Sequence, residues 1–204
     1  MGLEIYRRTV SKAKRSSILA AARKNFLKHG LSHAAMAEIA HDADVSTATL
    51  YKHFESKEVL FKEVVQEAYA PLSDDFTIYL DKRTAEEILF DLADQYLTSQ
   101  FDREVNALLR IVIAEVPGEP VLAREMYEQA VEQRYIRLAT VFDKMIEAKL
   151  LKPHDTKLSA RLIGGMIKEL FIWPAMFDQS YRLPADARVK IKTVIDVFLT
   201  YYRA

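Results

Sequence analysis

Residues that interrupt helices are scarce in this chain, which has only five glycines and six prolines among 204 residues. No stretch alternates apolar and polar residues over the length of a strand, and no Asn-Gly or Asp-Gly pair offers a tight hairpin turn. The sequence therefore predicts an all-α fold, in which apolar residues three and four positions apart form the packed faces of helices.

Glycine and proline divide this helical chain at Gly30, at Pro117-Gly118 and at Lys152-Pro153. Ser56 is suited to cap the fourth helix, and Pro71 leaves the end of that helix open between Tyr69 and Tyr79. The expected helices span residues 11–29, 36–43, 46–53, 56 to that open end, 84–99, 102–116, 120–150, 156–177 and 184–202.

Composition excludes several classes of site. The chain has no cysteine, so disulfides, thiolate zinc sites and cysteine nucleophiles are ruled out. His29 and His33 are four residues apart, but Gly30 breaks the helix between them and no carboxylate stands nearby, so no metal site is expected. No run approaches the roughly 18 apolar residues that span a bilayer. We expect a cytoplasmic protein with no membrane partner, no metal and no cofactor.

Charge is unevenly distributed, although the formal net charge is zero. Residues 1–62 carry eleven Lys and Arg against six Asp and Glu, a net charge of +5, and the remaining residues carry −5. Four of the five histidines also fall in the first segment. A basic segment attached to an acidic body is typical of a nucleic-acid-binding module, and the alternative is chance scatter of charged residues.

The segment from Lys14 to Val65 carries the most specific pattern in the chain. An alanine-rich first helix ends in Phe26 and Gly30, and an ordered set of short motifs follows. These are Ile39-Ala40, Val45-Ser46, Thr49-Leu50-Tyr51, His53-Phe54, Ser56-Lys57-Glu58 and Leu60-Phe61. The segment resembles the DNA-binding domain of the TetR/AcrR family of bacterial repressors. The resemblance implies a helix-turn-helix over residues 35–54, in a three-helix domain that a long helix joins to a C-terminal helical domain.

In a helix-turn-helix, the N-terminal residues of the recognition helix meet base edges while flanking groups bind phosphates. By resemblance, Thr47, Ala48 and Thr49 lie nearest the bases, and Tyr51, His53 and Lys57 contact phosphates. The full set of expected DNA-binding residues is Ala35, Met36, Val45, Ser46, Thr47, Ala48, Thr49, Tyr51, Lys52, His53 and Lys57. Without this context, Tyr51 and His53 are better interpreted as ordinary surface or packing residues.

Two positions depart from the family pattern. Asp44 replaces the usual glycine of the turn; it tolerates left-handed backbone geometry but adds a negative charge near DNA. Ala35 replaces the usual Ser or Thr, which removes a helix cap and a phosphate contact. Ser32 is expected to compensate in part for the loss at Ala35.

The C-terminal part resembles the AefR-like branch of the same family, through the run from Asn106 to Pro117 and that from Leu122 to Glu128. The resemblance implies an effector pocket among the middle helices and a four-helix dimer interface built from the last two. Expected pocket residues are Tyr96, Arg110, Glu115, Tyr127 and Trp173. Expected interface residues are Leu162, Gly165, Met166, Ile191, Ile195, Phe198 and Tyr202. In the last helix, Val189, Val197 and Tyr201 lie off the stripe that contains Ile191. Gly164-Gly165 indicates close helix approach at a dimer interface, or a kink.

The function expected is that of a dimeric DNA-binding regulator, a repressor released from a palindromic double-stranded operator by a small, mostly hydrophobic effector. The domains are then an N-terminal arm (1–11), the DNA-binding domain (12–60) and the effector-binding and dimerisation domain (61–204). One alternative is a family member whose N-terminal domain binds protein. The other is an enzyme, against which stands the lack of a nucleophile elbow, a phosphate-binding glycine loop and a metal-ligand set.

Overall fold

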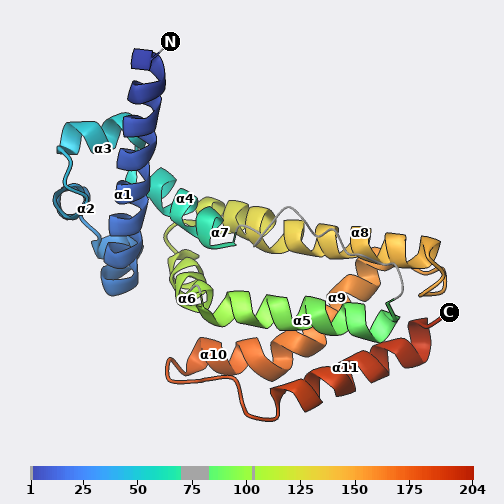
Figure 1. Ribbon diagram of the computed structural model, residues 1–204. Coiled ribbons are helices and arrows are strands. Elements are labelled where there is room, and N and C mark those ends of the chain that lie inside the picture. Colours follow the sequence, from blue (N-terminus) through green and yellow to red (C-terminus); the bar gives the residue numbers. More distant parts are fainter. Residues whose placement is uncertain (1, 70–82, 103) are drawn as a thin grey trace. The chain divides into compact units, whose positions relative to one another are not determined.

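The computed structural model describes residues 2–69, 83–102 and 104–204, and most of these residues are helical (Figure 1). Within these ranges no strand forms, and an isolated antiparallel bridge joins Leu151 to Arg203. The all-α prediction is confirmed. No helix in the described ranges is both long and apolar enough to cross a membrane.

Packing divides the chain into two compact units. The first consists of Met1–Tyr69 and Ala107–Met126, and the second of Ala70–Asn106 and Tyr127–Ala204. The packing units therefore differ from the predicted domains, because residues 61–69 and 107–126 group with the N-terminal helices. The predicted division at residue 60 concerns function and stays a prediction.

The first unit begins with the helices α1 (Gly2–His33), α2 (Met36–Asp42), α3 (Thr47–His53) and α4 (Lys57–Tyr69). The N-terminal arm over residues 1–11 stays a prediction, but the first helix, expected to begin at residue 11, begins earlier and includes residues 2–10. These residues contain neither proline nor an internal glycine, so an established helix extends through them. The predicted break at Gly30 is confirmed, because its φ of 73° interrupts α1. Pro71 and the interval beyond Tyr69 lie outside the described residues.

The core of the first unit joins α1 to the other three helices. The Phe26 ring of α1 meets the Phe61 ring of α4 edge to face, with centroids 5.0 Å apart. Ile39 of α2, Leu50 of α3 and Phe54 after α3 are at most 1% exposed. These apolar side chains hold the two short helices α2 and α3 against the longer helices, since helices of seven residues are not stable alone.

The later helices of the first unit are most of α6 (Val105–Glu115) and α7 (Pro120–Met126). The turn at Pro117-Gly118 separates them, as predicted. α7 packs on α4, where the Lys62 ammonium lies 2.8 Å from the Glu125 carboxylate.

The second unit consists of the remaining helical segments. They are α5 (Ala85–Asp102), the π-helix η1 (Tyr127–Glu132), α8 (Gln133–Glu147), α9 (Thr156–Ile167), the π-helix η2 (Lys168–Ile172), α10 (Trp173–Phe177) and α11 (Ala187–Tyr202). The sequence predicted uninterrupted helices over 120–150 and 156–177, and the π-helical turns correct this. A π-turn accommodates one additional residue per turn and shifts the helix faces on its two sides.

Side chains cap two helices of this unit. At α5, the Thr84 hydroxyl accepts a hydrogen bond from the Glu87 amide, and the Glu87 carboxylate accepts one from the Thr84 amide. The Thr84 hydroxyl also donates to the same carboxylate, and the two bonds donated by the Thr84 amide and hydroxyl lower the pKa of Glu87 because they favour its ionised form. At α9, the Asp155 carboxylate accepts a hydrogen bond of 3.0 Å from the Leu158 amide.

The core of the second unit is aromatic and aliphatic. Phe142 of α8 and Phe198 of α11 have ring centroids 5.4 Å apart, and Phe171 of η2 is fully buried. α11 packs against both α5 and α9, and α8 lies along α9. Figure 1 shows α11, in red, running beside α5, in green.

Candidate nucleic-acid interface

The turn between α2 and α3 is formed by backbone hydrogen bonds. The amide of Asp44 donates to the His41 carbonyl, and the amide of Val45 donates to the Ala40 carbonyl, each at 3.0 Å. Asp44 has a φ of 52°, so it adopts the left-handed conformation that the sequence led us to expect at this position. The Asp44 side chain is exposed beside the start of α3.

Ser46 caps the recognition helix α3. Its hydroxyl oxygen accepts a hydrogen bond of 3.1 Å from the Thr49 amide and lies 2.8 Å from the Thr49 hydroxyl. A serine in this position supplies one of the acceptors that the first turn of a helix lacks. Ser46 and Thr49 therefore have a structural role in addition to the DNA contacts predicted for them.

One face of α3 is open to solvent. Thr47, Ala48, Tyr51 and Lys52 are exposed, and Tyr51 retains 50% of its accessible surface. These four residues lie within an arc of about 140° on a helix of 100° per residue. Leu50 lies on the opposite side and is fully buried. The structure thus gathers three hydrogen-bonding side chains and one methyl group on a single accessible face.

Other predicted contact residues lie at the edge of this face. Val45, Thr49 and His53 are half-buried. The His53 ring lies 6.4 Å from the Phe54 ring, centroid to centroid, at the end of α3. Part of each of these side chains therefore packs against other residues of the first unit, and only the rest is accessible to DNA.

The start of α2 is less well capped than the start of α3. Ala35 is the N-cap of α2 and makes no side-chain capping bond, as the sequence predicted. Ser32 does not replace that cap, because its hydroxyl donates to the Glu115 carboxylate at 3.0 Å and its amide donates there at 3.3 Å. Ser32 therefore does not supply the missing cap, and its compensation for the lost phosphate contact stays a prediction. Met36, the first residue of α2, is half-buried.

Lys57 begins α4, and its ammonium donates a hydrogen bond of 3.0 Å to the Ser32 carbonyl. This contact holds the start of α4 to the end of α1. The predicted phosphate contact of Lys57 stays a prediction, and the remaining ammonium protons and the first amides of α4 are the groups that suit an anion.

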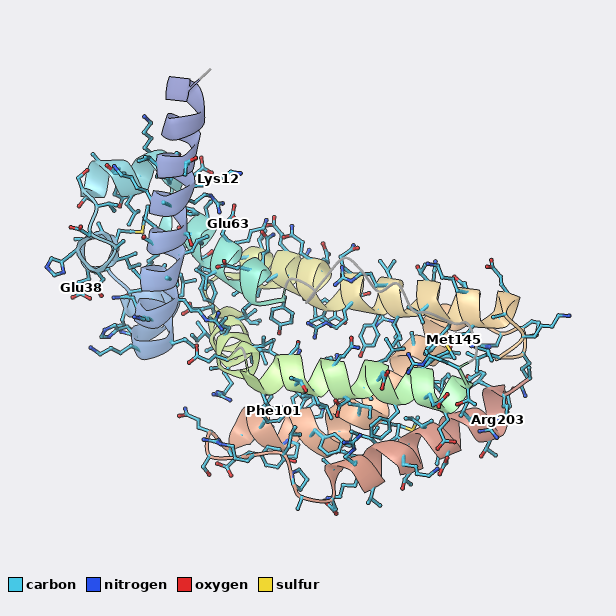
Figure 2. All side chains as sticks on the ribbon, in the orientation of Figure 1. Lys12, Glu38, Glu63, Phe101, Met145 and Arg203 are labelled. Carbon is cyan, nitrogen blue, oxygen red and sulfur yellow. The ribbon has the colours of Figure 1, made fainter. Side chains whose placement is uncertain are left out.

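Basic residues of α1 divide into two kinds that the sequence did not distinguish. The Arg15 guanidinium lies 2.7 Å from the Glu63 carboxylate and 4.9 Å from the Phe54 ring centroid, so it joins α1 to α4 and to the end of α3. Lys12 and Lys14 are exposed on α1, and Figure 2 labels Lys12. Only contacts with residues far along the chain distinguish a structural arginine from a solvent-exposed lysine.

The five predicted pocket residues are divided between the two compact units. Arg110 and Glu115 belong to the first, where Glu115 binds Ser32. Tyr96, Tyr127 and Trp173 belong to the second. The interaction between Glu115 and Ser32 gives that carboxylate a structural role that the sequence did not predict. Trp173 is 50% exposed and stacks on Phe177, so it is not enclosed within its own unit.

Three residues of the predicted dimer interface are buried within their own unit, and the interface itself stays a prediction. Ile191, Ile195 and Phe198 are at most 2% exposed, because the stripe that carries them packs into the core of the second unit. The exposed stripe of α11 is instead the one that carries Val189, Val197 and Tyr201, with exposed fractions between 56% and 67%. Buried side chains cannot meet a second subunit without unfolding the first.

The other predicted interface residues remain accessible. Leu162 is 47% exposed, Gly165 is exposed, and Met166 and Tyr202 are half-buried. An open groove between α9, η2 and α11 is lined by Gly165, Met166, Leu170, Val197 and neighbouring residues. Two of these accessible residues, Gly165 and Met166, thus line the groove.

Gly164 and Gly165 differ in what surrounds them. A Cβ atom on Gly164 would lie 2.7 Å from Cε1 of Tyr135, whereas one on Gly165 would meet nothing within 4 Å. Within the chain, Gly164 brings α9 close to an aromatic ring of α8, and the close approach predicted for this pair at a dimer interface stays a prediction.

Both parts of the chain are similar to known proteins. A family model described as bacterial regulatory proteins of the tetR family matches residues 18–64, and one described as the AefR-like transcriptional repressor C-terminal domain matches residues 87–204. The HTH-type transcriptional regulator AcrR of Shigella flexneri is 27% identical over 91% of this chain and 89% of its own length.

Solved structures agree with these matches. A putative TetR-family regulator from Mesorhizobium loti is 31% identical, with a TM-score of 0.86 over 95% of this chain and 98% of its own. The flavonoid-responsive regulator FrrA is 30% identical, with a TM-score of 0.72 over 93% of this chain and 97% of its own.

Proposed function

The chain belongs to the TetR family of transcriptional regulators, and we propose that it is a dimeric repressor that leaves a palindromic DNA operator when a small effector binds. The observation that carries this proposal is the exposed face of α3 formed by Thr47, Ala48, Tyr51 and Lys52. A helix-turn-helix that presents such a face fits the major groove, which admits an α-helix.

Each exposed residue of α3 has a role that follows from its chemistry. Thr47 offers a hydroxyl to a base edge, and Ala48 offers a methyl group to the methyl of thymine. Tyr51 and Lys52, one turn later, donate to phosphate oxygens and hold the helix in register. His53 and Lys57 extend this set of phosphate contacts along the same side of the unit.

Dimerisation is supported by the accessible apolar surface of the second unit. Leu158 and Leu162 of α9 and Val197 of α11 are each about half exposed, at 52%, 47% and 56%. Large exposed apolar patches on soluble proteins commonly mark protein–protein interaction sites. A symmetric dimer through α9 and α11 covers them and sets two recognition helices about one DNA turn, or a multiple of it, apart.

Release by an effector follows from linkage. A ligand that binds better to the conformation that does not fit DNA lowers operator affinity, and DNA must lower ligand affinity by the same factor. FrrA, which is similar over nearly the whole chain, is described as responsive to flavonoids. That description supports a small-molecule effector for this protein.

The test of DNA binding is selection of bound fragments from genomic or random double-stranded DNA, followed by Kd measurements over a range of salt concentrations. We expect enrichment of a palindromic site. Lys52→Ala should weaken binding and reduce the slope of log K against log salt by about 0.9, because one phosphate contact is lost. Lys157→Ala removes an equal charge from the second unit and should leave the slope unchanged. Failure to enrich any palindrome contradicts the proposal.

Asp44 provides a second test of the same surface. Asp44→Gly should raise the free energy of unfolding by about 0.5 kcal/mol, because glycine adopts positive φ without steric cost. It should also strengthen DNA binding at low salt by removing a negative charge beside α3. Asp44→Asn removes only the charge, so it should strengthen DNA binding and leave the stability nearly unchanged. Equal DNA affinity of the Asn variant and the wild type would show that Asp44 lies far from the phosphates.

A further inference from the structure

Seven polar and aromatic side chains of the second unit gather where α8 packs on α9. They come from α5, η1, α8, α9 and η2, and we call them the Tyr135 cluster. Its members are Tyr96, Tyr127, Glu132, Arg134, Tyr135, Arg161 and Lys168.

Tyr135 lies at the centre of the cluster because Gly164 leaves room for it. A Cβ on Gly164 would lie 2.7 Å from Cε1 and 3.2 Å from the hydroxyl oxygen of Tyr135. Two cations approach the same ring, the Arg161 guanidinium at 5.0 Å and the Lys168 ammonium at 4.6 Å from its centroid. The ring face attracts each cation, whereas the two positive charges repel each other.

Arg161 has a partner of opposite charge. Its guanidinium forms an ion pair with the Glu132 carboxylate, and the Tyr127 hydroxyl hydrogen-bonds both Glu132 and Arg161. The two bonds lower the pKa of Glu132, since both favour the ionised form. Glu132 is therefore engaged by Arg161, with which it forms its ion pair.

Lys168 lacks an equivalent partner. Among the described residues, no carboxylate oxygen lies within 4 Å of its ammonium nitrogen, and the side chain is half-buried. Burial, together with the positive charges of Arg134 and Arg161, lowers the pKa of Lys168 to about 8. A half-buried ammonium in this position is destabilised unless a negative charge joins it.

We propose that the Tyr135 cluster binds the carboxylate of a small organic acid, which pairs with Lys168 and lies against the ring of Tyr135. Arg134, whose guanidinium lies 5.2 Å from the Tyr96 ring centroid, adds a second positive charge. The aromatic rings provide the apolar contact that an inorganic anion cannot use. The identification of this acid as the effector rests on the proposed function; the binding site itself does not.

The backbone around the cluster supports this assignment. Tyr127 and Glu132 are the first and last residues of η1, and Lys168 is the first residue of η2. π-helical turns are rare and occur frequently at functional sites. The cluster is also accessible, because Tyr127 and Arg161 are both 47% exposed. The small, mostly hydrophobic effector expected from the sequence stays a prediction, to which this proposal adds a carboxylate group.

The experiment measures ligand-induced thermal stabilisation of the full-length protein with two pairs of probes at equal ionic strength. Benzoate is compared with benzamide, and octanoate with octanamide, at millimolar concentrations. The two acids distinguish an aromatic from an aliphatic source of the carboxylate. We expect at least one acid to raise the Tm while its neutral amide does not.

Substitution of Lys168 then tests the contact. Lys168→Met keeps the apolar stem and should weaken binding of the acid by at least about tenfold, because a hydrogen bond to a charged group is lost. Lys168→Arg should retain most of the affinity. Lys157→Met, an exposed change on α9, should bind as the wild type does. The proposal is overturned if neither acid binds, if the amides bind equally well, or if Lys168→Met binds with unchanged affinity.

Measurement of operator affinity separates this proposal from the proposed function. An acid that binds through Lys168 and leaves operator affinity unchanged supports the site and contradicts its role as the effector site. Conversely, failure of both acids to bind, together with intact operator binding, overturns the site and leaves the DNA-binding function standing.

The pH dependence of stability gives a second readout that needs no ligand. Because the folded pKa of Lys168 is below its ordinary value of 10.5, the unfolded chain binds more protons between these two values. The charged Lys168 therefore lowers the free energy of unfolding by its full amount below about pH 8, and this destabilisation disappears as the pH rises toward 10.5. The stability of the wild type relative to Lys168→Met should therefore rise across this interval. The pKa of Arg161 is raised by its bonds to Glu132 and Tyr127, that of Glu132 is lowered by its bonds to Arg161 and Tyr127, and burial raises the pKa of Tyr135. If the difference in unfolding free energy between the wild type and Lys168→Met did not change with pH, Lys168 would not be held among positive charges.

Discussion

Val197→Glu is expected to convert the protein to a monomer and to weaken operator binding by at least about a hundredfold, because two linked half-site contacts become independent. Val197 is 56% exposed and borders the groove between α9, η2 and α11. In the proposed dimer its side chain is covered, and a carboxylate there is buried without a partner, at a cost of several kcal/mol. Sedimentation equilibrium gives the oligomeric state, and titration of the selected operator gives the Kd.

The control for this variant is Ile136→Glu. Ile136 is 49% exposed on α8, so the substitution makes the same chemical change at nearly the same exposure. It should leave both the oligomeric state and the operator affinity unchanged. A Val197→Glu protein that remains a dimer would place the interface elsewhere, and one that is monomeric with full operator affinity would remove the dimer from the DNA-binding mechanism.

Phe26→Ala is expected to lower the free energy of unfolding of the first unit by about 3–5 kcal/mol, because it removes a fully buried aromatic ring and leaves a cavity. The ring is 0% exposed and meets Phe61 edge to face, so the change also removes the contact between α1 and α4. Phe26→Leu keeps most of the volume and should cost less. Loss of the α1 scaffold should abolish DNA binding, since α2 and α3 are held in place through it.

Two probes distinguish the compact units in this experiment. Far-UV circular dichroism follows all helices, whereas fluorescence of Trp173, the one tryptophan in the chain, follows the second unit. In urea, Phe26→Ala should shift the circular dichroism transition more than the Trp173 transition. Equal shifts by both probes would show that the two units unfold as one, and no shift by either probe would contradict the core described here.

Local signals in the sequence predicted much of the secondary structure because their effects act over a few residues. Gly30 breaks α1 because its positive φ is available to glycine at no steric cost. Ser46 caps α3 through the amide of Thr49, three residues away. Asp44 adopts the left-handed turn that its position required. The π-helical turns at η1 and η2 were missed because no residue type signals them.

The candidate DNA-binding face was predictable for a related reason. A helix with one buried residue per turn leaves its opposite side free, so placing Leu50 in the core assigns Thr47, Ala48, Tyr51 and Lys52 to solvent. The dimer surface was not predictable in this way. α11 has apolar residues on two faces, and periodicity alone does not tell which of Ile195 and Val197 meets the core of its own chain.

The sequence alone determined that few residues interrupt helices, where most helices begin and end, and that residues 18–64 and 87–204 match one family of regulators. These properties depend on neighbouring residues or on their order. Only the tertiary structure decided that Glu115 binds Ser32, 83 positions away, and that Gly164 admits the Tyr135 ring. It also showed that Lys168 lies among positive charges. Contacts between distant residues depend on how helices pack, and helical periodicity specifies a face without specifying its partner.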